Sequence, residues 1–414
     1  MVSTPPSPAL DDATGSLMLS PGTHIGLNLI FLVPGETGGM EVYARELIAA
    51  LLDAVPAGVQ FTAFVSREAA AVSDGPWSGQ LPTITVPVHA RNRVQWVLGE
   101  QALLVPLAVR ARVDLLHSLA STAPLWGPFR RLTTVHDLIY ARHPEAHSGL
   151  RNKGMRMLVP AAVRRSDRVI AISQSTRHDL IELLGVRPDR IDVVPNGLGL
   201  VRRATPTPES QTRARFDLGE REVVLTLSAK RPHKNLLALI SALALIPPER
   251  RPLLILPGYP TWHEQELRER AASVGVLADV RFLDWVSGSE LEGLWGIARA
   301  FVFPSLYEGF GLPVLEAMAR GVPVACSNTS SLPEIAGDAA LMFDPQDERA
   351  MAAAIETLLS QDETARARTR ARGLAQAKQF TWRRTARLTL ESYVHALSVN
   401  GRGGLRHARS ARVP

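Results

Sequence analysis

The chain has 414 residues, of which 46% are hydrophobic and 21% charged, and its formal net charge is +6. These proportions are typical of a globular protein with enough apolar material for two cores. The single cysteine, Cys326, excludes an intrachain disulfide and a cysteine-rich metal site. Residues 399–414 carry four arginines and no acid, so the rest of the chain is almost balanced and lacks the broad basic face that nucleic acids require.

The two ends of the chain differ from its middle. Residues 1–23 have no cationic start and no apolar run, so we predict a disordered leader rather than a signal peptide. No apolar stretch reaches the roughly 18 residues of a membrane span, and the expected location is therefore the cytoplasm. Residues 399–414 are predicted to form a solvated, disordered tail. The alternative for this basic tail is weak attraction to anionic lipid at the inner face of a membrane.

The first part of the chain, residues 24–200, alternates between strand-like and helix-like segments. Short apolar runs rich in β-branched residues predict strands over residues 24–33, 59–65, 114–117, 132–135, 169–172 and 191–194. Apolar residues at helical spacing predict helices over residues 42–52, 95–109 and 155–165. This alternation indicates a mostly parallel sheet with helices on both faces.

A segment rich in Gly, Arg, Thr and Pro, residues 197–208, interrupts the pattern, which then restarts. The predicted strands are residues 223–228, 253–256, 280–283 and 300–303, and the predicted helices are residues 236–246, 264–274 and 287–299. Ser287 with Glu290 predicts a capping box at the start of the last helix. The predicted fold class is therefore α/β, with two doubly wound Rossmann-like domains over residues 24–200 and 201–380 and a ligand cleft between them.

The strongest local signal lies in residues 303–317, where a buried strand, a glycine-punctuated loop and a helix follow one another. Proline is favoured at the first helical position and glycine after the last, so the helix is expected to begin near Pro313 and to end before Gly321. Free backbone N–H groups at a helix N-terminus attract anions, and a pyrophosphate would suit them. The residues expected to offer these groups are Gly309, Phe310, Gly311 and Leu312.

Two carboxylates belong to the same segment. Glu308 lies in the loop, and Glu316 lies in the first turns of the helix. Both can accept hydrogen bonds from sugar or ribose hydroxyls. An ordinary β-α turn followed by an acidic first helical turn would account for Glu316, but it would not account for Glu308 together with the two glycines around Phe310.

A cationic turn follows the strand predicted at residues 223–228 and precedes the next helix. It contains Lys230, Arg231 and Lys234. Three cations around one β-α turn repel each other unless an anion lies among them, and a diphosphate leaving group would supply that anion. For Lys230 and Arg231 taken singly, a solvated surface turn is the alternative interpretation.

Two weaker signals lie in the first domain. Gly38 and Gly39, in the turn after the first strand, would let the backbone approach a ligand closely. Their spacing is not the dinucleotide fingerprint, which disfavours a nicotinamide enzyme. His136 and Asp137 follow the strand at residues 132–135 and would point into the cleft, unless the histidine only caps the strand end.

Glu308 and Glu316, with the glycines between them, resemble the E-x7-E signature of the retaining GT-B glycosyltransferases of family four. The resemblance covers nearly all of residue 25 to about residue 393. The other matching segments, in chain order, are Gly38-Gly39 and residues 135–138, 171–173, 194–197, 232–235 and 331–338. The resemblance implies a GT-B fold in which a final helix, residues 381–398, crosses back onto the N-terminal domain.

The resemblance also implies roles for the candidate residues. Lys234 and a nearby arginine would hold the donor diphosphate, Glu316 would bind the donor ribose, and Glu308 would contact the transferred sugar. His136 would lie close to the reacting sugar. Gly38-Gly39 would lie near a donor phosphate or the acceptor.

One position departs from the family pattern. Many relatives place an arginine five residues before the lysine, where this chain has Ala229, so Arg231 or Lys230 would substitute for it. The chain also lacks a D-x-D metal motif. No metal and no other cofactor is therefore expected, because side-chain cations and a helix N-terminus would take the place of the metal.

The predicted activity is transfer of a hexose, with retention of configuration, from a nucleoside-diphosphate sugar to a glycan or lipid-linked acceptor. Relatives with similar motifs are often mannosyltransferases, which favours GDP-mannose as the donor. A nucleotide-sugar epimerase on the same scaffold and a non-catalytic nucleotide-sugar-binding protein are the alternatives. A glycoside hydrolase also uses two carboxylates, but the cationic turn disfavours it because hydrolysis leaves no diphosphate to stabilise.

Overall fold

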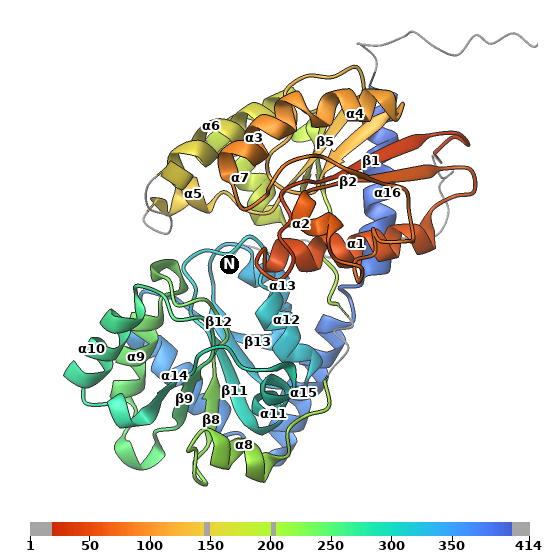
Figure 1. The fold of residues 1–414 in the computed structure, drawn as a ribbon. Coiled ribbons are helices and arrows are strands. Elements are labelled where there is room, and N and C mark those ends of the chain that lie inside the picture. The colour runs from red at the N-terminus through yellow and green to blue at the C-terminus, as the bar shows by residue number, and fades with distance from the viewer. Residues whose placement is uncertain (1–18, 145–149, 200–203, 400–414) are drawn as a thin grey trace, which may run out of the picture.

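The computed structural model describes residues 19–144, 150–199 and 204–399, with the side chains of residues 150–153 left aside. The chain folds into two α/β domains, one on either side of residues 200–203 (Figure 1). Most of the predicted leader and of the predicted tail lies outside the described residues. Among the helices that are described, none is both long and apolar enough to cross a membrane.

The N-terminal domain is built on a seven-stranded sheet in which every strand pairs parallel to its neighbours, in the order β3-β2-β1-β4-β5-β6-β7. Its strands are apolar because helices cover both faces of the sheet. Parallel pairing places the carboxyl ends of all the strands at one edge. The strands are β1 His24–Leu29, β2 Gln60–Val65, β3 Thr83–Thr85, β4 Leu115–Ser118, β5 Arg130–Val135, β6 Arg168–Ala171 and β7 Ile191–Val193.

Of the three helices predicted in this domain, those over residues 42–52 and 155–165 are confirmed within longer helices, and the third differs. The helix predicted over residues 95–109 is two helices, separated at Leu103, whose N–H still bonds to the carbonyl of Gly99. The helices are α1 Gly39–Ala54, α2 Arg67–Ala70, α3 Arg93–Ala102, α4 Leu104–Arg110, α5 Ile139–Arg142, α6 Leu150–Arg165 and α7 Gln174–Leu184.

The C-terminal domain has a six-stranded parallel sheet in the order β10-β9-β8-β11-β12-β13. Two of its strands, β12 and β13, were not among those predicted from the sequence. The capping box of Ser287 and Glu290 is confirmed. The strands are β8 Val223–Leu225, β9 Leu253–Leu256, β10 Val280–Phe282, β11 Ala298–Phe303, β12 Val324–Ser327 and β13 Ala340–Phe343. The helices are α8 Glu209–Arg215, α9 Leu236–Leu245, α10 Glu264–Ser273, α11 Gly288–Ile297, α12 Leu312–Ala319, α13 Leu332–Ala336, α14 Glu348–Leu359 and α15 Glu363–Ala377.

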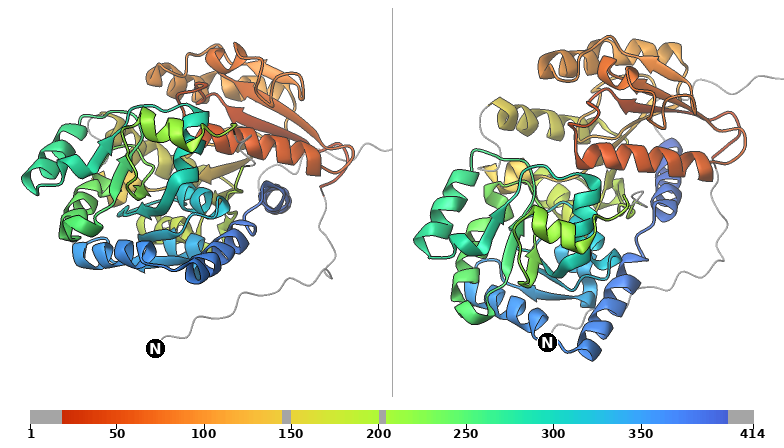
Figure 2. Two further views of the ribbon diagram at one scale, coloured as in Figure 1. Left: turned by 90° about the horizontal axis from the view of Figure 1, so that it is seen from below. Right: turned by 60° about the horizontal axis from the view of Figure 1, so that its bottom comes forward.

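The last helix, α16 Trp382–Ser398, follows the C-terminal domain in sequence but packs on the N-terminal one. It lies against α1 and strands β4, β5 and β6, and Figure 2 shows it (dark blue) apart from the other blue helices. Tyr393 of α16 is fully buried in the N-terminal core, and its hydroxyl lies 2.9 Å from Nδ1 of His117. The chain therefore crosses between the two domains twice, once after the N-terminal domain and once before α16.

Candidate active site

The two domains meet where the loop after β5 contacts the loop after β11. A Cβ atom placed on Gly309 would lie only 2.0 Å from the carbonyl oxygen of His136 and 2.9 Å from Cβ of Asp137. No side chain fits in that space, so the glycine is required by the close approach of the two backbones. Since both loops follow the carboxyl ends of their strands, the predicted edges of the two sheets face each other.

Two further contacts hold the domains in register, and neither residue had a predicted role. The hydroxyl of Tyr307 donates to Asp179 at 2.7 Å and accepts from the backbone N–H of Leu138 at 3.1 Å. The carboxylate of Glu334 accepts from the first two amides of α7, at 2.9 and 3.0 Å. Glu334 lies within the 331–338 segment that resembles the family, which was the only available signal. The Tyr307 contact could not be predicted from local patterns, because its partner is 128 residues away.

Lys234 and Glu308 form an ion pair beside this interface. The Lys234 ammonium lies 2.6 Å from Oε1 of Glu308, and both side chains are largely buried. The ammonium also lies 5.6 Å from the centre of the Phe303 ring. A lysine and a glutamate from the loops after two neighbouring strands, β8 and β11, are thus brought together at the carboxyl edge of the sheet.

Left-handed backbone conformations flank the pair on both sides. Asn235, directly after Lys234, has φ 57°, and Ser330, whose hydroxyl accepts from the N–H of Glu308 at 2.9 Å, has φ 53°. Asparagine tolerates this region, but for serine it is uncommon, and such residues concentrate at functional sites. The backbone on each side of the ion pair is therefore held in a specific shape.

Lys230 lies in the same turn as Lys234 but has a different environment. Its side chain is 1% exposed, and its ammonium donates to the carbonyls of Gly258 and Leu283 at 2.7 and 2.9 Å and lies 3.1 Å from Glu264. The two carbonyls accept two of the three protons of the ammonium group, and Glu264 balances its charge. The structure therefore places the Lys230 ammonium inside the domain rather than in the cleft. The donor contacts proposed for this turn are those of Lys234 and Arg231.

Arg231 keeps its capacity to bind an anion. Its side chain is partly buried, and within the described residues its guanidinium has no hydrogen-bond or ion-pair partner. Ala229, at the position where relatives carry an arginine, is exposed. Of the two cations predicted to substitute for that arginine, the structure leaves Arg231 available and Lys230 occupied.

The loop that precedes α12 presents unpaired backbone donors. Helix α12 begins at Leu312 with Gly311 as its N-cap, at φ 115°. The N–H groups of residues 309–312 make no hydrogen bond within the described part of the chain. Ser331 fixes the loop by donating to the carbonyls of Phe310 and Glu308 at 2.6 and 3.0 Å. Since the Phe310 side chain is buried against Ile172 and Phe380, only its backbone can face a ligand.

Glu316 lies in the second turn of α12, partly buried, and its carboxylate has no hydrogen-bond partner among the described residues. Burial raises the pKa of this carboxyl group; Arg320 opposes the rise and Glu292 adds to it. A hydroxyl group of a ligand that donates a hydrogen bond to this carboxylate would stabilise its charged form.

His136 contributes a neutral imidazole from the N-terminal domain. Its Nε2 lies 2.8 Å from the carbonyl oxygen of Leu119, and since a carbonyl only accepts, Nε2 carries the proton. Burial lowers the pKa of His136 to about 4. The edge of the ring meets Tyr43 at a centroid distance of 4.8 Å. At neutral pH His136 therefore has no charge, and Nδ1 remains as a hydrogen-bond acceptor.

Gly38 and Gly39 occupy the turn between β1 and α1. Gly38 caps the helix at φ 66°, a conformation that favours glycine. A Cβ atom on either residue would have no neighbour within 4 Å. Unlike Gly309, Gly39 is therefore not explained by protein packing, and the space beside it is open to a ligand.

The chain matches two family models. Residues 37–202 match Glycosyltransferase Family 4, and residues 209–373 match Glycosyl transferases group 1. The chain is 37% identical over 272 residues to the O-antigen chain mannosyltransferase B of Escherichia coli, covering 64% of this chain and 70% of that relative. It is 30% identical over 403 residues to the D-inositol 3-phosphate glycosyltransferase of Frankia alni, covering 88% of this chain and 96% of that relative.

Solved structures agree in fold. Sucrose-phosphate synthase from Thermosynechococcus elongatus superposes with a TM-score of 0.70 at 21% identity, covering 90% of this chain and 98% of that one. Anabaena HepE in complex with UDP and glucose superposes with a TM-score of 0.67 at 22% identity, covering 90% and 99%. The arrangement of two facing sheets is thus shared with structures of low sequence identity.

Proposed function

The chain belongs to glycosyltransferase family 4, with the GT-B fold, and on that premise we propose that it transfers mannose from GDP-mannose to a glycan or lipid-linked acceptor with no metal ion. The family assignment makes it a retaining glycosyltransferase that uses a nucleotide sugar. The donor, the acceptor and the roles of individual residues are the proposed part.

The observation that carries the proposal is the grouping of Lys234, Arg231 and the amides of residues 309–312 at adjacent strands of one sheet. A diphosphate needs several donors aimed at its oxygens, and these groups come from the loops after β8 and β11. The Arg231 guanidinium and these amides have no hydrogen-bond or ion-pair partner among the described residues. A phosphate anion would satisfy those donors together.

The Lys234–Glu308 ion pair suggests how donor binding prepares the site. In the free protein each group neutralises the other. A diphosphate that binds the Lys234 ammonium would release the Glu308 carboxylate, which could then accept a hydrogen bond from a hydroxyl of the transferred sugar. Glu316 would accept from the ribose, and Nδ1 of neutral His136 would accept from a second sugar hydroxyl.

The reaction can then be written with these residues in place. The bond between the anomeric carbon and the phosphate oxygen breaks, and its electron pair stays on the oxygen, where Lys234, Arg231 and the amides stabilise the growing charge. The acceptor oxygen attacks the anomeric carbon from the same face. Its proton passes to the departing diphosphate, so no side-chain nucleophile is needed.

Mannose is proposed because of the relatives. The O-antigen chain mannosyltransferase B of Escherichia coli, at 37% identity, is named for that sugar. HepE was solved with UDP and glucose, but at 22% identity that likeness speaks only to the fold.

A donor panel tests the proposal. Thermal unfolding is measured with GDP, UDP, ADP and their mannose and glucose conjugates, and a ligand at 100 times its Kd should stabilise the fold by about 2.7 kcal/mol. We expect GDP and GDP-mannose to stabilise most. If UDP, ADP or their sugar conjugates stabilise the fold and GDP and GDP-mannose do not, GDP-mannose is rejected as the donor.

NMR of the product then tests the reaction. Mannose should appear on an added acceptor glycan with its anomeric configuration unchanged. A new sugar still attached to the nucleotide, formed without acceptor, would indicate an epimerase, and tight binding without turnover of any acceptor would indicate a non-catalytic binding protein.

A further inference from the structure

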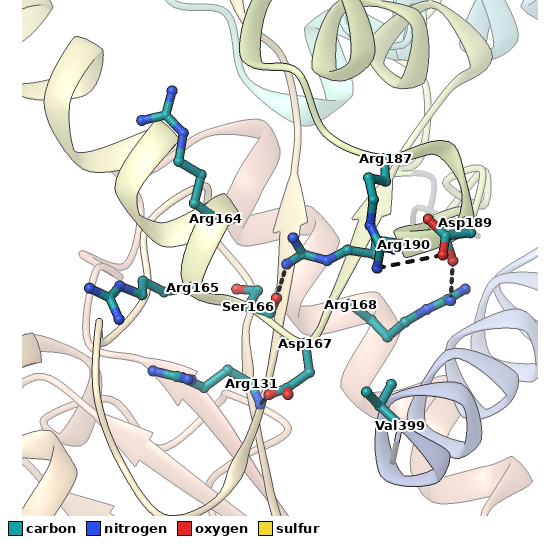
Figure 3. Close-up of a pocket in the computed structure, with 10 residues that line it drawn as sticks. All are labelled: Arg131, Arg164, Arg165, Ser166, Asp167, Arg168, Arg187, Asp189, Arg190 and Val399. Atoms are coloured by element: carbon teal, nitrogen blue, oxygen red, sulfur yellow. Dashed lines mark hydrogen bonds and ion pairs between the residues drawn. The ribbon is translucent and has the colours of Figure 1, made fainter. Parts of the chain in front are cut away.

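A cavity of about 550 Å³ lies in the N-terminal domain at the amino ends of β5, β6 and β7, the edge of the sheet opposite the active site (Figure 3). Arg131 is the second residue of β5 and His136 follows its end, so the two sites are roughly 16 Å apart along one strand. The last described residue, Val399, also lines the cavity. Nothing in the proposed transfer reaction uses this region.

The lining of the cavity is strongly basic. Six arginines and only two aspartates, Asp167 and Asp189, line it, which leaves a surplus of four positive charges. Figure 3 shows that they come from different elements, namely the end of α6, the starts of β5 and β6, and the turn before β7. The six are Arg131, Arg164, Arg165, Arg168, Arg187 and Arg190.

The six arginines differ in how far the protein itself neutralises them. Arg168 pairs with Asp192, and Arg190 donates to the carbonyl oxygen of Ser166. In contrast, the exposed Arg164 and Arg165 have no hydrogen-bond or ion-pair partner within the described residues. Among the residues that the structure describes, the Arg187 guanidinium has a single ion-pair contact, a long one of 3.6 Å with the exposed Asp189.

Ordinary structural reasons account for part of this arrangement. Arginines in the last turn of a helix are stabilised by the helix dipole, which explains Arg164 and Arg165 as residues of α6. The dipole does not explain why Arg187 and Arg190 lie across from them. The crowding has a cost, because burial and the nearby Arg187 both lower the pKa of Arg190. Bound anions would offset that repulsion.

We propose that this cavity binds a ligand carrying phosphate groups, either a free polyanion such as a pyrophosphate or the headgroup of an anionic lipid. Guanidinium groups pair with phosphate oxygens two at a time, and they suit phosphate better than a single carboxylate. The large volume and the surplus of four charges fit more than one phosphate. The ligand would bind without contacting the residues proposed for sugar transfer.

Calorimetric titration with inorganic pyrophosphate tests the proposal on the full chain. The titration uses Lys234→Ala throughout, which weakens pyrophosphate binding at the proposed donor site, so that the comparison between variants reports on the arginine-lined cavity. In that background, Arg165→Ala is compared with Arg110→Ala, since each removes an arginine that ends a helix and has no ion-pair partner among the described residues. The double change Arg164→Ala/Arg165→Ala gives the full effect. Circular dichroism verifies that each variant is folded.

We expect pyrophosphate to bind the Lys234→Ala chain at about one site. The affinity should fall about tenfold or more in the double variant, less in Arg165→Ala, and not at all in Arg110→Ala. Absence of pyrophosphate binding together with absence of vesicle binding would overturn the proposal. Equal losses in Arg165→Ala and Arg110→Ala would also overturn it, because the effect would then be that of net charge.

A sedimentation assay identifies the source of the phosphate. The chain without the Lys234 change is mixed with phosphatidylglycerol vesicles or with phosphatidylcholine vesicles. Recruitment only to phosphatidylglycerol, reduced in the double variant, supports a lipid headgroup, whereas pyrophosphate binding without recruitment supports a free phosphate ligand. Recruitment that the double variant retains in full assigns the membrane contact to other residues, such as the arginines of the tail, which every variant keeps.

Discussion

The two faces that meet at Gly309 and His136 differ in the kind of groups that they present. The C-terminal face presents charge, in Lys234, Arg231 and the carboxylates that follow β11. The N-terminal face presents a histidine that burial keeps neutral and a glycine turn beside open space. In the proposed reaction, the C-terminal domain would therefore stabilise the diphosphate, and the N-terminal domain would supply shape and uncharged hydrogen-bonding groups.

The largest expected effect comes from removing the charge on the C-terminal face. Lys234→Ala should lower kcat by about 10²–10³, because deleting one preorganised donor to a developing oxyanion typically costs that much. Lys234→Arg should retain more activity than Lys234→Met, which keeps the length but loses the charge. The measurement is kcat at saturating donor for the three variants. Wild-type turnover in Lys234→Met would remove this residue from the chemical step.

Lys230→Ala provides the matched control in the same turn. It would leave two carbonyls and Glu264 without their buried cation, so it should lower the melting temperature. Lys234→Ala should lower the melting temperature less, because the Lys234 side chain is 16% exposed against 1% for Lys230 and has a single ion-pair partner. A larger loss of melting temperature in Lys234→Ala than in Lys230→Ala would contradict the structural role given to Lys230.

Glu316→Ala should mainly weaken donor binding. The proposed partner is a ribose, which does not react, so the donor KM should rise roughly ten- to hundredfold while kcat falls less. Steady-state kinetics with varied donor measures both constants. An unchanged donor KM would exclude Glu316 from the donor site.

A smaller effect is expected on the N-terminal face. Gly39 has ordinary backbone angles and open space around it, so Gly39→Ala should fold normally. If a substrate approaches this backbone, one KM should rise about tenfold, which corresponds to about 1.4 kcal/mol. Gly296→Ala, in α11 and equally free of neighbours, is the control and should have no effect. Identical kinetics in both variants would argue against a ligand at Gly38-Gly39.

The last effect concerns the stability of the N-terminal domain rather than catalysis. Burial raises the pKa of Glu100 to about 7, so the folded state binds a proton that the unfolded state releases near its usual value. Stability from this group is present at low pH and is lost as the pH rises from about 4.5 to 7, by at most about 1.4 kcal/mol per pH unit. Glu100→Gln keeps the acceptor oxygen for Asn28 and Thr122.

Urea unfolding at pH 5 and pH 8 measures this effect. The free energy of unfolding of Glu100→Gln should increase relative to that of the wild-type chain as the pH rises. The donor kinetics should stay unchanged. A constant difference between the two proteins across this range would show that Glu100 titrates normally.

Much of the fold could be predicted from the sequence because parallel strands buried on both faces are continuous apolar runs. Strand Leu253–Leu256 and the Ser287–Glu290 capping box are local patterns, and both are confirmed. The division between α3 and α4 was missed because the apolar spacing continues through Leu103. Local spacing does not record how two helices pack against a sheet.

The candidate site was only partly predictable. Lys230 and Lys234 look alike in sequence, and they differ only because the carbonyls of Gly258 and Leu283 surround one of them. The ion pair of Lys234 with Glu308 and the contact of Tyr307 with Asp179 join residues far apart in the chain. Such pairings depend on the tertiary fold.

Net charge was the weakest guide. A body close to neutral predicted that the broad basic face required by nucleic acids is absent, but it could not reveal a local cluster such as the six arginines around one cavity. A sum over the chain says nothing of where the charges lie, because the compensating acids are elsewhere on the surface.

The central claim is that the cations and amides of the C-terminal face stabilise the leaving diphosphate without a metal ion. The most direct test measures transfer from GDP-mannose to an acceptor glycan in excess EDTA, with and without added Mg²⁺ or Mn²⁺. We predict that the rate in EDTA equals the rate with metal, and that Lys234→Met lowers both alike. Complete loss of transfer in EDTA, restored by Mg²⁺ or Mn²⁺, would contradict the account.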